Sequence, residues 1–172
     1  MSGVDVTTLN ILIVEDNVHF STLMNSILRA LGITNLEEAN DGGEALELLS
    51  DITPDLVIVD WKMEGMDGVE CVRKIRSLPG ENRYVPIIMV TGYTESSLKK
   101  LARDAGVNDF LGKPISPQSL LGHIVSVMEN PRSFIDVAGY FGPDRRRVGA
   151  AHDGEERRVA ENLVAVPSKA QI

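Results

Sequence analysis

The first 130 residues alternate between short apolar runs and longer segments with a helical spacing of apolar positions. Continuous apolar runs of about five residues are typical of strands that are buried on both faces of a parallel sheet. The run at 35–39 is weak, because only Leu36 and Ala39 are apolar in it. The pattern therefore predicts strands at residues 9–14, 35–39, 56–59, 86–90 and 109–111.

The segments between these runs carry apolar residues three and four positions apart, which is typical of helices with one buried face. Such stripes lie within residues 20–31, 43–49, 69–75, 98–105 and 117–128. Five strand–helix units in succession predict an α/β fold, namely a doubly wound five-stranded parallel sheet with helices on both faces. The pattern does not set the strand order. We expect the flavodoxin-like order 2-1-3-4-5, which is one of the two common choices.

Polar residues follow the predicted strands at the edge of the sheet where open α/β folds bind their ligands. Glu15 and Asp16 follow the first strand, Asp60 the third, Thr91 the fourth and Lys113 the fifth. Three carboxylates in one site raise one another's pKa unless a cation lies between them, and Mg²⁺ binds carboxylate and phosphate oxygens. An ammonium and a hydroxyl beside such an ion can hold phosphoryl oxygens. This set of groups points to phosphoryl transfer with a carboxylate as the nucleophile.

Four motifs carry a family resemblance, and they read ILIVEDN, LVIVDWKMEGMDG, MVTGY and DFLGKPIS. Their order and spacing resemble the receiver domain of two-component response regulators over residues 8–130. The resemblance implies that Asp60 accepts a phosphoryl group from a histidine on a sensor kinase or a histidine phosphotransfer protein. It also implies that the domain promotes its own phosphorylation and dephosphorylation and is a signalling switch rather than a conventional enzyme.

The resemblance implies a role for each strand-end residue. Mg²⁺ would be bound by Asp16, by Asp60 and by the backbone carbonyl of Lys62, with Glu15 acting through water. Thr91 and Lys113 would hold the phosphoryl group, and the peptide bond after Lys113 is usually cis in this family.

Two positions depart from the family pattern. Glu64 stands where most members have proline, and Phe110 stands at the switch aromatic, which is often tyrosine. Phe110 can still change rotamer but has no hydroxyl, so its coupling to the output stays open.

Plainer readings of these residues also exist. Most acidic residues are solvated, and a lysine or threonine at a strand end is often only structural, but here all five positions are filled together. A phosphatase with an aspartyl nucleophile is disfavoured because such enzymes usually need a second aspartate at position 62, which is lysine. A receiver that serves only as a scaffold is disfavoured, because every position that phosphoryl transfer needs carries a suitable residue. We expect Cys71 to be a small core residue and Trp61 a partly exposed loop aromatic.

Composition and charge exclude several classes of protein. The 172-residue chain has one cysteine, which excludes a disulfide scaffold and a cysteine-based zinc site. We find no apolar run long enough for a transmembrane helix and no secretory signal, so we expect a cytoplasmic location and no membrane partner. The formal net charge is −8, and an acidic body of this kind does not favour nucleic acid as a partner.

Residues 131–172 form a C-terminal tail beyond the receiver, which we assign to residues 1–130. We expect the tail to be partly disordered, with a short helix over 155–166. It contains an aromatic cluster with Tyr140 and Phe141, followed by the basic run Arg145, Arg146 and Arg147. Exposed aromatic clusters are costly, so we expect this one to dock on the receiver or on a partner.

These observations predict a stand-alone response regulator that signals through protein contacts. Its partners would be the phosphoryl donor and a downstream protein. A homodimer through the face of the fourth helix, fifth strand and fifth helix is a further option. In the alternative, the basic tail binds nucleic acid or an effector as the output.

Overall fold

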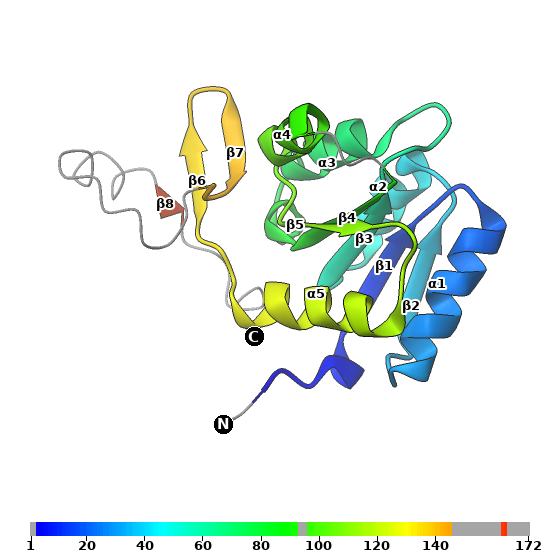
Figure 1. Ribbon diagram of the computed structural model, residues 1–172. Helices are drawn as coiled ribbons and strands as arrows, with labels where there is room; N and C mark the ends of the chain where they lie inside the picture. The colour runs from blue at the N-terminus through cyan, green and yellow to red at the C-terminus, as the bar shows by residue number, and fades with distance from the viewer. Residues whose placement is uncertain (1–2, 93–95, 146–162, 165–172) are drawn as a thin grey trace.

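The computed structural model describes residues 3–92, 96–145 and 163–164 (Figure 1). Its main sheet is parallel, has five strands and follows the order β2-β1-β3-β4-β5. The strands are β1 Asn10–Val14, β2 Asn35–Ala39, β3 Leu56–Asp60, β4 Ile87–Thr91 and β5 Asp109–Gly112. The predicted fold class and strand order are therefore confirmed.

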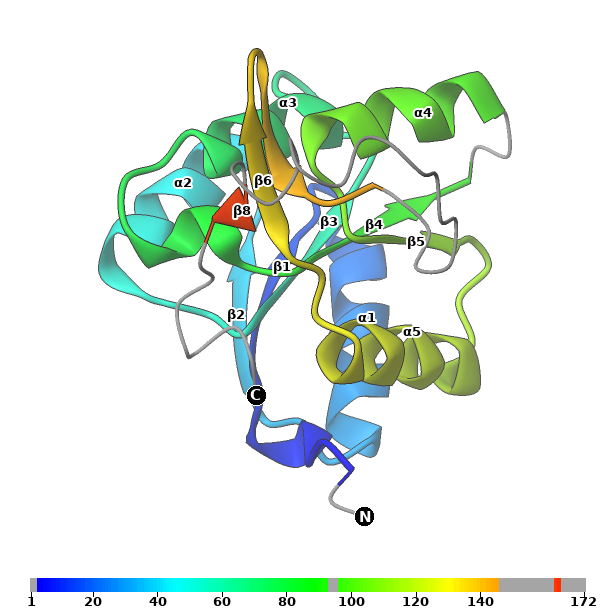
Figure 2. The same ribbon diagram turned by 90° about the vertical axis from the view of Figure 1, so that its left-hand side faces the viewer.

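Helices cover both faces of this sheet (Figures 1 and 2). One face carries α1 (Val18–Ala30) and α5 (Pro117–Glu129). The other face carries α2 (Gly42–Asp51), α3 (Gly68–Arg76) and α4 (Ser96–Ala105). The chain also forms two short 3-10 helices, η1 (Val6–Thr8) and η2 (Glu81–Tyr84). A side-chain oxygen caps the first turn of four α-helices, which offsets the unpaired N–H groups there. These caps are Asn17, Asp41, Asp67 and Ser116.

The core has one apolar layer on each side of the sheet. Successive strand residues point to opposite faces, so each continuous apolar run supplies both layers. Val57 and Val59 pack with α2, α3 and α4, whereas Ile58 packs with α1 and α5. Cys71 is buried in the first layer, as predicted. The prediction for Trp61 was wrong, because its side chain packs in the same layer and is only 8% exposed.

The first part of the tail forms a β-hairpin. Strand β6 (Phe134–Val137) pairs antiparallel with β7 (Tyr140–Pro143) and, on its other side, with the two-residue strand β8 (Leu163–Val164). The predicted helix over 155–166 is therefore wrong at residues 163 and 164, where backbone pairing with β6 prevails over helical spacing. Residues 155–162 lie outside the described residues.

Aromatic contacts dock this hairpin on the receiver fold, beside α3 and α4 (Figure 2). The ring of Tyr84, in η2, lies 5.2 Å from that of Phe134 and 5.3 Å from that of Phe141, both edge to face. Arg83 stacks on Phe141, with its guanidinium carbon 3.6 Å from the ring centroid. The aromatic cluster thus packs against the chain's own receiver, with Phe134 buried and Tyr140 and Phe141 half-buried.

A buried arginine lies beneath the hairpin. Arg76, at the end of α3, is 3% exposed, and the ring of Phe134 lies 5.1 Å from its guanidinium carbon. Its N–H groups donate five hydrogen bonds, to the carbonyls of Gly106, Arg83 and Val85 and to Asn108 Oδ1. These bonds offset the cost of burying the charge, although burial still lowers the pKa of Arg76 to about 9.

Arg76 therefore joins several segments of the fold. It connects α3, the segment before β4, the turn between α4 and β5, and the hairpin. Gly106 permits the close approach in that turn: its φ is +107°, and a Cβ there would lie 3.0 Å from the Arg76 side chain.

Strand β7 also contacts α4 through polar groups. Arg145 forms an ion pair with Asp104 of α4 and stacks on Tyr140, 4.2 Å from the ring centroid. The Tyr140 hydroxyl donates a hydrogen bond to the Pro143 carbonyl at 2.8 Å. Arg146 and Arg147 lie outside the described residues. No helix within the described ranges is long and apolar enough to span a bilayer.

We predict that Phe134→Ala lowers the free energy of unfolding by about 3 kcal/mol, because it removes the ring that covers Arg76 and opens a cavity under the hairpin. Urea denaturation measures this change. Leu101→Ala is the matched control: Leu101 is 43% exposed on α4, so its loss should change stability by less than about 0.5 kcal/mol. An equally small effect of Phe134→Ala would contradict a docked hairpin.

Candidate functional site

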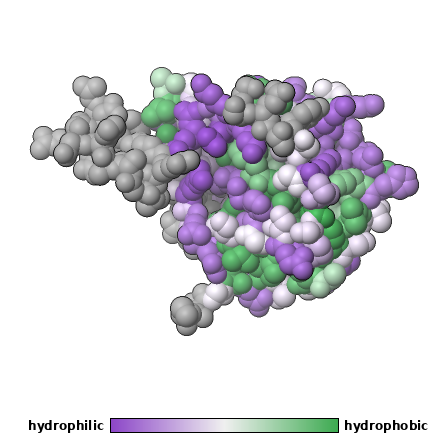
Figure 3. Space-filling view, in the orientation of Figure 1, coloured by the Kyte–Doolittle hydropathy of each residue, from purple (hydrophilic) through white to green (hydrophobic). Residues whose placement is uncertain are grey.

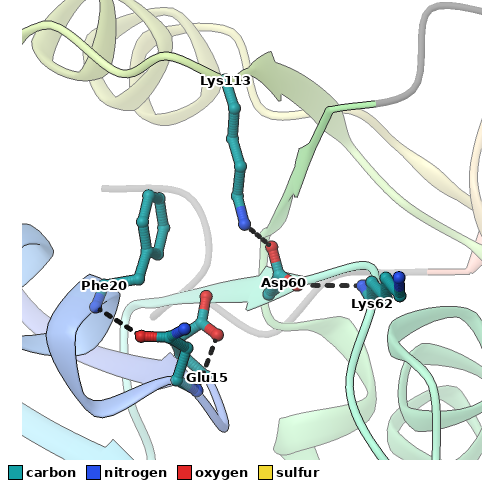
Figure 4. Close-up of polar contacts among 6 residues, drawn as sticks. Glu15, Phe20, Asp60, Lys62 and Lys113 are labelled. Atoms are coloured by element: carbon teal, nitrogen blue, oxygen red, sulfur yellow. Dashed lines mark hydrogen bonds and ion pairs between the residues drawn. The ribbon is translucent and has the colours of Figure 1, made fainter.

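Asp60 lies at the carboxyl end of the central strand β3, and it is 4% exposed. Its Oδ1 lies 2.7 Å from Lys113 Nζ, and its Oδ2 accepts a hydrogen bond of 2.9 Å from the backbone N–H of Lys62 (Figure 4). Burying a carboxylate costs free energy unless a nearby opposite charge and hydrogen bonds offset the loss of water. Lys113 and the Lys62 amide supply both.

Glu15, at the end of β1, is the second buried carboxylate, also 4% exposed. Its Oε1 accepts a hydrogen bond of 3.0 Å from Asn17 N–H, whereas its buried Oε2 has no hydrogen-bond partner in the described structure. Burial raises the pKa of Glu15 to about 7. The negative charges of Asp60 and Asp16 act in the same direction, while the Asn17 hydrogen bond and the charge of Lys113 oppose the rise.

Asp16 is only partly buried and connects two loops of the site. Its Oδ2 accepts a hydrogen bond of 2.8 Å from the backbone N–H of Glu64, in the loop that follows β3. Proline has no N–H to donate. The departure from the family pattern at position 64 therefore provides a bond that a proline could not make.

Thr91 and Phe110 lie on the neighbouring strands β4 and β5. Thr91 is 3% exposed, and its backbone carbonyl accepts a hydrogen bond of 2.9 Å from Lys113 N–H. Phe110 pairs in register with Met89, two residues before Thr91, and its half-buried ring packs in the same apolar layer as Met89. Phe110 and Thr91 thus share one face of the sheet. The bond between Lys113 and Pro114 is cis, as the family resemblance implies.

Two residues of the site were missed by the sequence analysis. The Phe20 ring lies 4.1 Å from Lys113 Nζ, but its helical spacing marked it only as a core residue. Gly68 begins α3, and a Cβ there would lie 2.3 Å from the Asp60 carbonyl oxygen. No larger residue fits there without moving β3 or α3. The signal for Gly68 in the sequence was its position next to Asp67, the residue that caps α3.

Those tail residues singled out in the sequence that the structure describes do not join this site. Tyr140, Phe141 and Arg145 lie in and after β7, which is beside α4 rather than at the carboxyl ends of the strands (Figure 1). The surface of the molecule on the side seen in Figure 1 carries a mixture of polar and apolar side chains (Figure 3).

The sequence and the fold of this chain are similar to those of known proteins. The family model of the response regulator receiver domain matches residues 11–125. The chain is 35% identical over 121 residues to a chemotaxis protein CheY of Pseudomonas aeruginosa, an alignment that covers 70% of this chain and 97% of that protein. It is also 35% identical over 129 residues to the transcriptional regulatory protein PdtaR of Mycobacterium tuberculosis. That alignment covers 75% of this chain and 61% of PdtaR.

Among solved structures, the chain is similar to the receiver domain of the sensor histidine kinase PA1611 from Pseudomonas aeruginosa PAO1. The TM-score is 0.61 at 30% identity, covering 69% of this chain and 94% of the other. That structure is described with a magnesium ion coordinated in its active-site cleft. The family match, the strand order and the strand-end residues agree, and the chain belongs to the response regulator receiver domains, the phosphoryl-accepting proteins of two-component systems.

Proposed function

We propose that Asp60 is the phospho-acceptor of this receiver and that the donor is a histidine of a sensor kinase or a histidine phosphotransfer protein. One observation carries this proposal. Asp60 is a buried carboxylate at the end of the central strand, and each of its oxygens has its own donor, the Lys113 ammonium and the Lys62 amide. The carboxylate is thus paired with a cation and held in one orientation before a phosphoryl group arrives.

In the proposed transfer, a bond forms between an Asp60 oxygen and phosphorus while the bond from phosphorus to the donor imidazole nitrogen breaks. The electron pair of that bond remains on the imidazole. Negative charge on the phosphoryl oxygens is offset by the Lys113 ammonium and a hydrogen bond from the Thr91 hydroxyl. Hydrolysis of the aspartyl phosphate by water returns Asp60 and releases inorganic phosphate. In this proposal the domain promotes both its own phosphorylation and its own dephosphorylation.

The acidic residues fit a magnesium ion. Glu15 has a buried oxygen without a hydrogen-bond partner in the described structure and a pKa raised by burial, and a cation nearby would offset both costs. Within the described residues, no group of three His, Cys, Asp or Glu side chains is arranged to hold a metal alone. The ligands that we propose are those that the family resemblance implies: Asp16, Asp60, the Lys62 carbonyl and waters, one of them held by Glu15. The ion would neutralise charge on the phosphoryl group.

The proposed output is a change in protein contacts. Thr91 and Phe110 share one face of the sheet, so movement of Thr91 toward a phosphoryl group can be followed by a rotamer change of Phe110 and repacking beside α4. A downstream protein, or a second copy, would bind the face of α4, β5 and α5.

The alternative in which the basic tail binds nucleic acid gains no support from the described part of the tail. Arg145 is already paired with Asp104 and stacked on Tyr140. The cytoplasmic location and the division into a receiver (1–130) and a tail (131–172) stay predictions.

We predict that incubation with acetyl phosphate and Mg²⁺ adds the mass of one phosphoryl group to the wild-type chain and none to Asp60→Ala, because the nucleophile is gone. Intact-protein mass spectrometry measures this. Asp67→Ala is the control, since Asp67 only caps α3, and it should be modified like the wild type. Equal modification of wild type and Asp60→Ala, or of neither, would refute the assignment.

We predict that Glu15 makes stability depend on pH and on Mg²⁺. Because its pKa is raised from 4.5 to about 7, folding favours its protonated form. Its contribution is therefore full below about pH 4.5 and is lost as the pH rises through 7. At pH 8, Mg²⁺ should raise the melting temperature of the wild type by about 5 °C, and by clearly less in Glu15→Gln.

Calorimetry without and with Mg²⁺ between pH 5 and 8 measures both effects. Glu64→Gln is the matched control, because this exposed acid acts through its backbone only. A wild-type and a Glu15→Gln chain with the same pH slope and the same response to Mg²⁺ would count against the proposed site.

A further inference from the structure

The ammonium of Lys113 lies between a carboxylate and an aromatic ring. Its Nζ is 2.7 Å from Asp60 Oδ1 and 4.1 Å from the centroid of the Phe20 ring. Figure 4 shows the two side chains reaching the site from different elements, Phe20 from the first turn of α1 and Lys113 from the loop after β5. At 4.1 Å the ring is close enough for a cation–π interaction.

The ring is held in place by the local structure of α1. Phe20 is half-buried and packs against the apolar layer beneath α1 and α5. Its backbone N–H donates a hydrogen bond of 3.1 Å to Oδ1 of the capping residue Asn17, and Asn17 N–H donates in turn to Glu15 Oε1. The ring therefore has a defined position relative to the acidic residues.

Lys113 needs such support. Its side chain is 33% exposed, and a lysine side chain is long, flexible and strongly hydrated. Holding it in one rotamer costs conformational entropy. A ring on one side favours the ammonium in its position next to Asp60 and excludes water from that side, which strengthens the attraction to the carboxylate.

We propose that Phe20 is a positioning residue that holds the Lys113 ammonium against Asp60 for phosphoryl transfer. This inference rests on the proposed function of Asp60 and Lys113. Phe20 acts through Lys113, so its effect on the reaction should exist only while Lys113 is present.

A double-mutant cycle tests this dependence. The rate of phosphorylation by acetyl phosphate is measured for the wild type, Phe20→Leu, Lys113→Met and the double variant. In this reaction a bond forms between an Asp60 oxygen and phosphorus while the bond from phosphorus to the acetate oxygen breaks. Phe20→Leu should slow the reaction by roughly 3- to 30-fold. In the Lys113→Met background the same substitution should have less than about a 2-fold effect.

Two further variants separate positioning from general damage to α1. Phe20→Tyr keeps the aromatic face and should retain a rate within about 3-fold of the wild type. Leu23→Ala removes an exposed apolar residue of the same helix and should leave the rate unchanged. Equal slowing by Phe20→Leu in both backgrounds, or no slowing in either, would overturn the proposal.

A second readout does not need the reaction. In the wild type, the NMR signals of the Lys113 side chain beside Nζ should be shifted upfield by the ring current of Phe20, and Phe20→Leu should abolish the shift. Its absence from the wild type would refute the contact itself. A chain that shows the shift but gains no phosphate would refute the proposed function of Asp60, and with it the role of Phe20 in transfer, while the contact would stand.

Discussion

The burial of the Asp60 carboxylate at the end of a central strand is the constraint on which the site depends. A lone carboxylate that is 4% exposed would be protonated or would destabilise the fold. The sheet order places β3 between β1 and β4, so that residues of both neighbours and of the loop after β5 reach this one point. Lys113 supplies the opposite charge and Lys62 the hydrogen bond. Gly68 allows α3 to begin against the strand end.

The fold also buries a positive charge, on Arg76, and accommodates it in another way. Arg76 takes its partners from backbone carbonyls and one amide oxygen, and Phe134 covers it. These bonds satisfy the guanidinium and leave it no polar group for a ligand. Asp60, by contrast, contacts the partly exposed Lys113, which in the proposed transfer turns toward the incoming phosphoryl group. The buried charge of Arg76 stabilises the attachment of the hairpin, and that of Asp60 is placed for the proposed phosphoryl transfer.

Much of this structure could be predicted from the sequence because the signals are local. Apolar runs such as 56–59 and the polar residues that follow them indicate strands and the edge where their ends meet. The contact between Phe20 and Lys113 could not be predicted, because it joins residues far apart in the chain and Phe20 has the spacing of an ordinary core residue. Arg76 likewise resembles a surface residue at a helix end, and only the tertiary fold surrounds it with carbonyls.

The same reason explains the errors. Leu163 has helical spacing with Val159 and Val166, yet Leu163 and Val164 pair with β6, whose position depends on the docking of Phe134. Trp61 follows a strand and looked like a loop residue, but the approach of α3 through Gly68 encloses it. Each error concerns a residue whose surroundings come from elements distant in the sequence.

The most direct test of the central claim locates the phosphoryl bond itself. Borohydride reduces an aspartyl phosphate to homoserine, so treatment of the phosphorylated chain followed by peptide mass spectrometry identifies the residue that carried the phosphate. We predict homoserine at position 60 and at no other position. Reduction at Asp16, at Glu15 or at any acidic residue outside the strand ends, with Asp60 intact, would contradict it.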